Sequence, residues 1–157
     1  MKSKSPRRSA RELALQSLYA WQLAGGEAGE LLAQARQARE YEHADSALLE
    51  TLVRGVIARA TDLQGLIAPC LDRSFASLSP VERAVLYIGA FELSAEAATP
   101  VKVVINEAIE IGKSFGGTDG YKFVNGVLER LAATLRPAEF ARARRRPAPA
   151  TCPPSSS

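Results

Sequence analysis

The sequence predicts an all-α protein of about seven helices, joined by short connections and packed into a compact bundle. Three observations favour this class. Apolar residues recur every three or four positions over most of 9–136, capping residues and glycines mark several helix starts and stops, and no alternating β-branched run is long enough for a sheet. At 157 residues, one domain with a substantial core is expected.

The first half of the chain contains four predicted segments. Ser9 and Glu12 form a capping-box pattern, so a helix is expected to open there and to stop before Gly25-Gly26. An alanine-rich helix follows, then a helix that begins near Asp45 with leucine and valine every three or four residues, then a short piece. The expected bounds are about 9–23, 28–40, 45–65 and 66–73.

The second half contains three helix starts. In Ser79-Pro80-Val81-Glu82, serine stands at the N-cap, proline at the first helical position and glutamate at the third. Thr99-Pro100 repeats the Ser/Thr-Pro start, and Gly116-Gly117 is expected to end the helix that it opens. Asp119 is the expected N-cap of the last helix, about 120–135.

Charge is distributed unevenly along this chain of net charge +3. Residues 1–11 carry five basic groups and no acid, and residues 136–157 carry five basic groups against Glu139. The segment between them, 12–135, therefore has ten basic and sixteen acidic groups, a net of −6. Basic arms on a folded body commonly meet a phosphate backbone, although they can also serve as solubilising tails.

This pattern predicts three regions. They are a basic flexible arm at 1–8, a helical domain at 9–136, and a disordered Arg/Pro/Ser tail at 137–157, where apolar periodicity is lost. No apolar run approaches the roughly 20 residues of a membrane span, and the basic N-terminus lacks the apolar region of a signal peptide. We therefore expect a cytoplasmic protein without a membrane partner.

Few residues are available for catalysis or metal binding. His43 is the single histidine, so every histidine-dependent site would have to use it, and Cys70 and Cys152 are isolated thiols. Glu107 and Glu110 stand three apart on one helix, but no histidine or second carboxylate pair completes a site, so we assign them to a solvated face. We expect no catalytic residue, no metal and no cofactor.

The segment Asn106–Leu128 has the composition of a binding surface. Basic, aromatic and amide side chains crowd a helix junction there, as a surface that holds single-stranded RNA requires. Lys122 lies nearly opposite the buried stripe of its helix, and Phe123 lies at the stripe's boundary beside Arg130. Phe123 could stack on a base or pack against another helix, and Tyr19 is either a ligand contact or a core-edge tyrosine.

Three blocks of sequence resemble the NusB family of bacterial transcription antitermination factors. They are RRSARELALQSLYAWQL at 7–23, SPVERAVLYIGAFEL at 79–93 and TPVKVVINEAIEIGKSFGGTDGYKFVNGVL at 99–128. The resemblance covers roughly 9–136 and implies two packed three-helix bundles plus an N-terminal helix. It also implies a non-enzymatic factor that binds boxA RNA in nascent ribosomal RNA transcripts together with the ribosomal protein NusE. With other Nus factors, this complex helps elongating RNA polymerase read through terminators.

The resemblance also implies roles for particular residues. The RNA-facing positions are Arg7, Arg8, Tyr19, Phe115, Asp119, Lys122, Phe123 and Asn125. Glu82 matches a glutamate near the joint surface for RNA and NusE, although the capping box alone explains it, and Tyr87 is a second expected partner contact. Tyr87 and Tyr121 stand where the family can have a basic residue and a histidine, which lowers the local positive charge.

Three points stay open at this level. The family contains both monomers and homodimers, so the resemblance leaves the oligomeric state undecided. A NusB-like domain can also target RNA for an rRNA methyltransferase, and a purely helical protein–protein adaptor is a further alternative. Tyr121 could belong to the RNA face or to the core.

Overall fold

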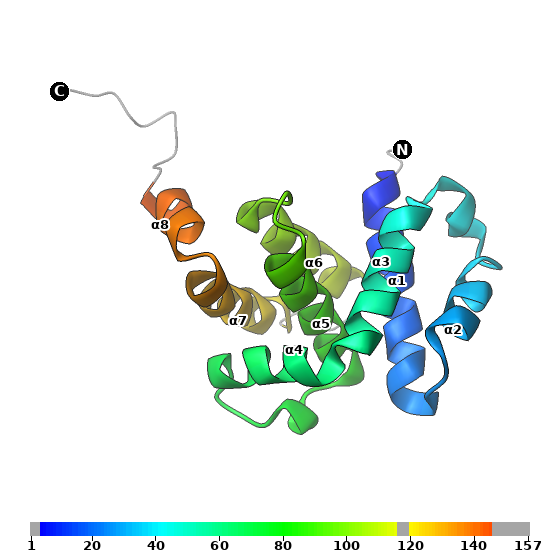
Figure 1. Ribbon diagram of the computed structural model, residues 1–157, viewed down its shortest axis with the longest axis horizontal. Coiled ribbons are helices and arrows are strands. Elements are labelled where there is room, and N and C mark those ends of the chain that lie inside the picture. The colour runs from blue at the N-terminus through cyan, green and yellow to red at the C-terminus, as the bar shows by residue number, and fades with distance from the viewer. Residues whose placement is uncertain (1–3, 116–119, 146–157) are drawn as a thin grey trace.

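The structure, a computed structural model, describes residues 4–115 and 120–145 and is helical throughout (Figure 1). The α-helices in these ranges are α1 (Pro6–Ala24), α2 (Ala28–Ala35), α3 (Ser46–Ala58), α4 (Ala60–Ile67), α5 (Pro80–Ala95), α6 (Val101–Phe115), α7 (Gly120–Leu135) and α8 (Pro137–Arg145). Short 3-10 helices lie at η1 (Arg39–His43), η2 (Ala68–Cys70) and η3 (Phe75–Ser77). No strand occurs within the described ranges, and the predicted all-α class is confirmed.

Two three-helix bundles make up the body of the molecule (Figure 1). Helices α1, α2 and α3 contact one another, as do α5, α6 and α7, and α5 also contacts α1, α3 and α4. The predicted two-bundle architecture is therefore confirmed. The N-terminal helix α1 is part of the first bundle, and the additional helices are α4, which packs on α5, and α8, which packs on α7.

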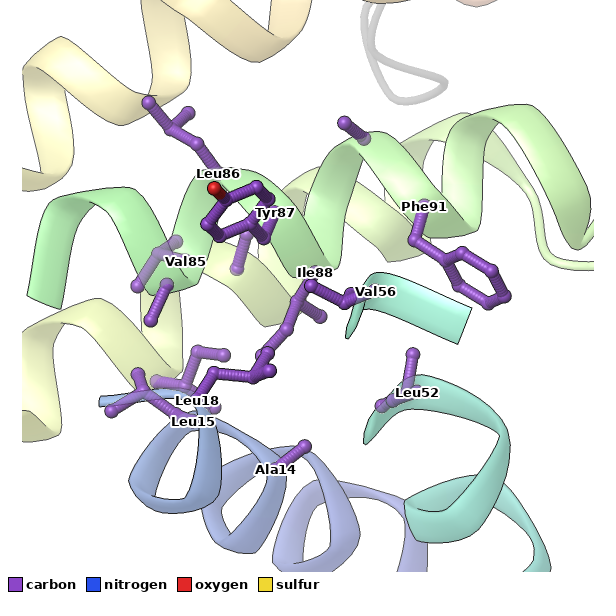
Figure 2. Close-up of a cluster of buried hydrophobic side chains, with 14 of the residues drawn as sticks. Ala14, Leu15, Leu18, Leu52, Val56, Val85, Leu86, Tyr87, Ile88 and Phe91 are labelled. Carbon is purple, nitrogen blue, oxygen red and sulfur yellow. The ribbon is translucent and has the colours of Figure 1, made fainter. Parts of the chain in front are cut away.

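Helix α5 lies at the centre of the core and is buried continuously from Ala84 to Leu93 (Figure 2). Such burial requires close approach by its neighbours. A Cβ at Gly89 would stand 2.8 Å from a methyl carbon of Leu128 on α7, and a Cβ at Gly55 on α3 would stand 2.3 Å from the Phe91 ring. Glycine at these two positions lets α7 and α3 pack directly against α5.

Helix α1 begins earlier than the capping pattern predicts. Ser5 is the N-cap and accepts a hydrogen bond from the Arg8 amide at 3.1 Å, with Pro6 in the first turn. Ser9 and Glu12 are buried residues within α1 and not at its start, and Glu12 accepts a hydrogen bond from Lys4 Nζ at 2.6 Å. Residues 6–8 of the predicted flexible arm are thus helical, because a serine and a proline upstream provide an equally good start.

The helix expected at 45–65 is two helices that meet at Arg59. The backbone of Arg59 leaves the helical region (φ −115°, ψ 20°), and its Nη1 donates to Ser94 Oγ at 3.2 Å. The break turns α4 against α5, so tertiary packing overrides a periodicity that is continuous in sequence. The alanine-rich helix also ends early, at Ala35, and the chain continues into η1.

The start of the predicted disordered tail is a helix, α8, anchored by Arg136. The Arg136 guanidinium donates to the carbonyl oxygens of Glu92, Leu93, Glu96 and Thr99 at 2.6–3.0 Å. The Glu139 carboxylate accepts a hydrogen bond of 2.7 Å from the Val101 amide, so it lies at the N-terminal end of α6. This hydrogen bond lowers the pKa of Glu139. Residues 137–145 of the predicted disordered tail are thus helical, and residues 146–157 lie outside the described ranges.

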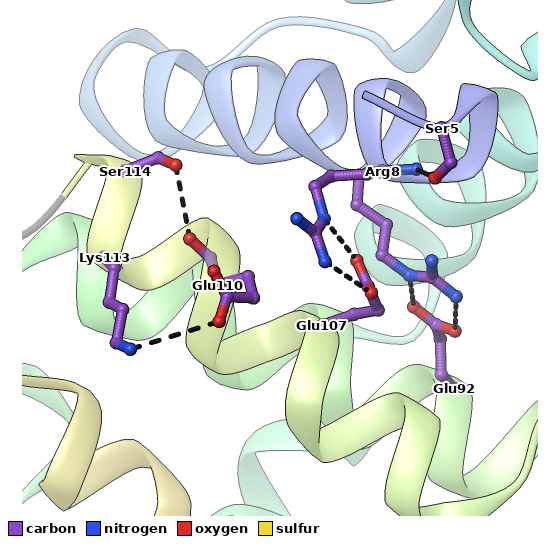
Figure 3. A network of polar contacts seen from close by, with 8 residues as sticks. Ser5, Arg8, Glu92, Glu107, Glu110, Lys113 and Ser114 are labelled. Carbon is purple, nitrogen blue, oxygen red and sulfur yellow. Dashed lines mark hydrogen bonds and ion pairs between the residues drawn. The ribbon is translucent and has the colours of Figure 1, made fainter. Parts of the chain in front are cut away.

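A buried ion pair joins the two bundles. Arg11 on α1 donates from Nε and Nη2 to the two carboxylate oxygens of Glu92 on α5, both at 2.8 Å, with side chains 3% and 1% exposed (Figure 3). Burial alone would lower the pKa of the Arg11 guanidinium, but the hydrogen bonds and charge of Glu92 outweigh it and the pKa is raised. Both ions are therefore paired in the core.

Candidate nucleic-acid interface

Helices α1 and α6 lie side by side and run in the same direction (Figure 3). Arg8 near the start of α1 makes two hydrogen bonds to Glu107 on α6, at 3.0 and 2.9 Å. An α-helix rises 1.5 Å per residue, so Tyr19 lies about 16 Å beyond Arg8 along α1. On α6, Phe115 lies about 12 Å beyond Glu107 by the same measure. The two aromatic side chains, 40% and 36% exposed, therefore point to solvent near the same end of the helix pair.

The start of α5 closes this end of the molecule. The predicted capping box is present, since Glu82 N donates to Ser79 Oγ and Ser79 N donates to Glu82 Oε1, each at 3.1 Å. Gln22 on α1 donates to the Pro80 carbonyl at 2.9 Å and accepts from Arg83 Nε at 2.6 Å. These bonds hold the end of α1 against the beginning of α5.

The first turn of α7 lies beside the same capping box. A Cβ at Gly120 would stand 3.5 Å from Glu82 Oε2. A cavity of about 50 Å³ separates the start of α5 from Tyr121, which is half-buried, and Lys113 Nζ lies 4.9 Å from the centroid of the Tyr121 ring. Tyr121 thus lies at the border between core and surface. Asp119, the predicted cap of this helix, lies outside the described residues.

Lys122 and Phe123 occupy different sides of α7. Lys122 is exposed, and Asn125, three residues later and half-buried, lies on a nearby face. Phe123 is half-buried and packs against the core, while the guanidinium carbon of Arg73 lies 4.7 Å from its ring centroid. The ring is therefore both a packing residue and a platform that already holds a cation.

The N-terminal arginines are engaged in ion pairs at the opposite end of α1. Arg7 Nη1 lies 3.5 Å from Asp45 Oδ2 in a largely exposed pair. The hydrogen bonds that Arg8 donates to Glu107 raise the pKa of the Arg8 guanidinium and lower the pKa of the Glu107 carboxyl. Glu107 is therefore an ion-paired residue and not a freely solvated one as predicted, whereas Glu110 lies on the surface 4.0 Å from Lys113 Nζ.

Tyr87, an expected partner contact, is 3% exposed (Figure 2). Its ring makes edge contacts with Trp21 and Phe75, and its hydroxyl accepts a hydrogen bond from Gln64 Nε2 at 2.7 Å. Burial raises the pKa of this hydroxyl. The ring offers a partner almost no surface, and the role assigned to Tyr87 stays a prediction.

Four of the ten predicted site residues lie on the face formed by α1, α6 and the start of α7. Tyr19, Phe115 and Lys122 lie near the end where α1, α5, α6 and α7 meet, and Arg8 bridges α1 and α6 through its bonds to Glu107. Sequence reasoning missed Arg73, because it lies between η2 and η3, where periodicity carries no signal. It also missed Glu107 as the partner of Arg8, 99 residues away in the chain.

The described residues contain neither a metal-binding cluster nor a membrane-spanning helix. Residues 4–115 and 120–145 contain no cluster of three or more His, Cys, Asp or Glu side chains that could hold a metal ion. None of the helices in these ranges is long and apolar enough to cross a membrane. The features that remain are exposed aromatic and basic side chains on a helical scaffold.

Exposed aromatic and basic side chains on a helical scaffold are typical of nucleic-acid-binding proteins, and the all-α fold is the frame that carries them here. A model of the NusB family matches residues 8–133, and the chain belongs to this family of transcription antitermination factors. It is 56% identical over 136 residues to the transcription antitermination protein NusB of Burkholderia cenocepacia, and the aligned region covers 87% of this chain and 94% of that protein. The transcription antitermination protein NusB of Burkholderia mallei is 54% identical, and its aligned region covers the same fractions of the two chains.

Two solved structures have the same fold. NusB of T. maritima superposes with a TM-score of 0.75 at 29% identity, covering 89% of this chain and 99% of that one. A structure of the antitermination factors NusB and NusE in complex with dsRNA matches with a TM-score of 0.71 at 25% identity, covering 81% and 96%. The predicted family and its antitermination function are confirmed.

Proposed function

We propose that this chain binds boxA-type RNA in nascent ribosomal RNA transcripts together with NusE. The complex then acts on elongating RNA polymerase with other Nus factors, so that polymerase reads through terminators. The observation that carries the proposal is the convergence of exposed Tyr19, Phe115 and Lys122 at one end of the helix pair α1–α6. Support also comes from a relative whose structure contains NusB, NusE and dsRNA.

Unpaired bases suit this surface better than a duplex does. Exposed aromatic rings offer stacking worth about 1–3 kcal/mol per base, and stacking needs bases that are not already stacked on each other. Lys122, with Arg7 and Arg8 along α1, would neutralise backbone phosphates, which makes binding salt-dependent. A phosphate near Arg8 must compete with Glu107 for the guanidinium.

NusE is proposed to bind near Glu82, where the start of α5 adjoins the first turn of α7. Asp119 and Asn125 are proposed to contribute to the RNA face as the family pattern implies. A homodimer that covers this end of the molecule would compete with RNA. The oligomeric state, measured by light scattering, therefore decides the concentration range for binding experiments.

The proposal is tested by titrating labelled boxA-type RNA, single-stranded and as a duplex, with and without NusE. Tyr19→Ala and Lys122→Ala are expected to weaken binding of the single strand about tenfold each. Val103→Ala and Lys102→Ala are matched controls near the opposite end of α6: Val103 is 41% exposed against 40% for Tyr19, and Lys102 is exposed like Lys122.

Three outcomes would contradict the proposal or its mechanism. If no RNA binds with or without NusE, the chain would be better described as a protein–protein adaptor. If the four variants lose affinity equally, binding would reflect general charge and not this surface. Preference for the duplex would keep an RNA function but refute the stacking mechanism.

A further inference from the structure

We propose that Arg73 is a further RNA-contacting residue, and that Arg73 and Phe123 form one composite stacking surface. The inference rests on the proposed RNA-binding function and extends its surface to the far side of α7. Arg73 lies between η2 and η3, outside the sequence blocks that carry the family resemblance. Its guanidinium carbon is 4.7 Å from the centroid of the Phe123 ring.

The geometry leaves the Arg73 guanidinium available. A cation within about 6 Å of a ring centroid is attracted to the ring face, so Phe123 orients the planar group. The side chain is 52% exposed, and its ion pair with Asp72, itself 77% exposed, has Nε 3.1 Å from Oδ1. Exposed pairs of this kind are weak, so Asp72 can be displaced by a phosphate.

The segment that carries Arg73 is fixed to α7. Arg130 Nε donates to the Cys70 carbonyl at 2.9 Å, and η2 packs against α7. Phe123 and Arg130 are seven residues apart, close to two helical turns, so they lie on the same face of α7. Ring, loop and arginine are therefore held together before any ligand arrives, which reduces the entropy lost on binding.

An arginine stacked on a ring suits an unpaired nucleotide. The guanidinium carbon lies over the phenylalanine ring, so the opposite face of the group can stack on a base, and its N–H groups can donate to phosphate or to base oxygens. The positive charge also matters because residues 12–135 carry a net charge of −6. A basic side chain on this body therefore offsets part of its net repulsion of RNA.

The competing explanation is purely structural, in that the Arg73 stem covers the apolar ring of Phe123 and serves only the fold. The two explanations differ in what Arg73→Ala changes. A structural role predicts a lower unfolding temperature with unchanged RNA affinity. The composite surface predicts weaker RNA binding in a protein that remains folded.

The experiment measures anisotropy of single-stranded boxA-type RNA over a range of salt concentrations, with thermal unfolding in parallel. Arg54→Ala is the matched control, because Arg54 is also 52% exposed and pairs with an exposed carboxylate, Glu50, but lies on α3. Arg73→Ala is expected to weaken binding about five- to tenfold and to reduce the salt slope by about 0.7. Arg73→Lys should keep the slope but lose part of the affinity, because a lysine cannot stack as a plane.

Phe123→Leu tests whether the two residues act as one unit. Leucine keeps most of the apolar volume and removes the ring, so Arg73→Ala should cost less in that background than in the wild type. Equal costs in both backgrounds would overturn the composite surface. If the wild type binds RNA but Arg73→Ala has the same affinity and salt slope as Arg54→Ala, the inference is overturned and the proposed function still stands. A wild-type chain that binds no RNA would overturn both.

Discussion

Replacing Arg11 or Glu92 is expected to destabilise the fold strongly, because each is half of a buried ion pair between the two bundles. The pair has two hydrogen bonds of 2.8 Å, and the side chains are 3% and 1% exposed. Removing one partner leaves a charge in the core with no solvent to stabilise it. Such uncompensated charges typically cost about 3–5 kcal/mol.

The perturbation is a double-mutant cycle of Arg11→Met, Glu92→Leu and the combination. Each single substitution should lower the free energy of unfolding by about 3–5 kcal/mol. For a chain of this length that corresponds to roughly 2–4 °C of unfolding temperature per kcal/mol. The double variant should recover most of the loss, since an apolar pair close in volume is often nearly neutral.

Urea denaturation followed by circular dichroism measures all four proteins. The coupling energy between the two sites is expected to be at least about 3 kcal/mol. Single losses below about 1 kcal/mol would show that water reaches the pair and that it behaves as a surface pair. Additive single losses would refute the argument that the two charges stabilise each other.

The remaining predictions concern other charges and one close contact. Glu107→Gln should tighten RNA binding by releasing Arg8. The hydrogen bonds from Arg8 lower the pKa of Glu107, so the carboxylate stabilises the fold above its unfolded pKa of about 4.3 and loses this effect as pH falls through the lower, folded pKa. The difference in urea stability between wild type and Glu107→Gln should therefore narrow as the pH is lowered below about 4.3, and a constant difference would contradict this. Arg136→Met should cost about 2–3 kcal/mol and expose α8 to limited proteolysis, because buried carbonyls lose their donor; protection like that of the wild type would contradict it. Gly55→Ala should lower the unfolding temperature, as its Cβ would stand 2.3 Å from a buried phenylalanine ring, whereas Gly65→Ala, with nothing within 4 Å, should raise it slightly.

Helix starts could be read from sequence wherever the capping residues were unambiguous. The Ser79–Glu82 capping box is present as predicted, and α7 spans Gly120–Leu135. The start of α1 was misplaced because Ser5 and Ser9 both fit a capping pattern. The break at Arg59 could not be foreseen, since it depends on α4 packing against α5.

The candidate surface likewise contains some residues that the sequence could place and others that depend on the folded chain. Lys122 was placed toward solvent by helical periodicity, which is a local property, whereas periodicity left Tyr19 open between a ligand contact and a core-edge tyrosine. Arg73 lies in an irregular segment and reaches the Phe123 ring only through the folded chain. Arg8 was expected to be free for RNA, but its partner Glu107 is 99 residues away.

The sequence by itself determined the all-α class, the family, and the side of each long helix that is buried, because these depend on spacing within one helix or on motifs of contiguous residues. Tertiary structure decided which charges are paired, where the third helix breaks, and that residues 137–145 form a helix. The reason is physical: an ion pair such as Arg11–Glu92 depends on how two helices pack. Nothing in the spacing of either helix encodes the distance between them.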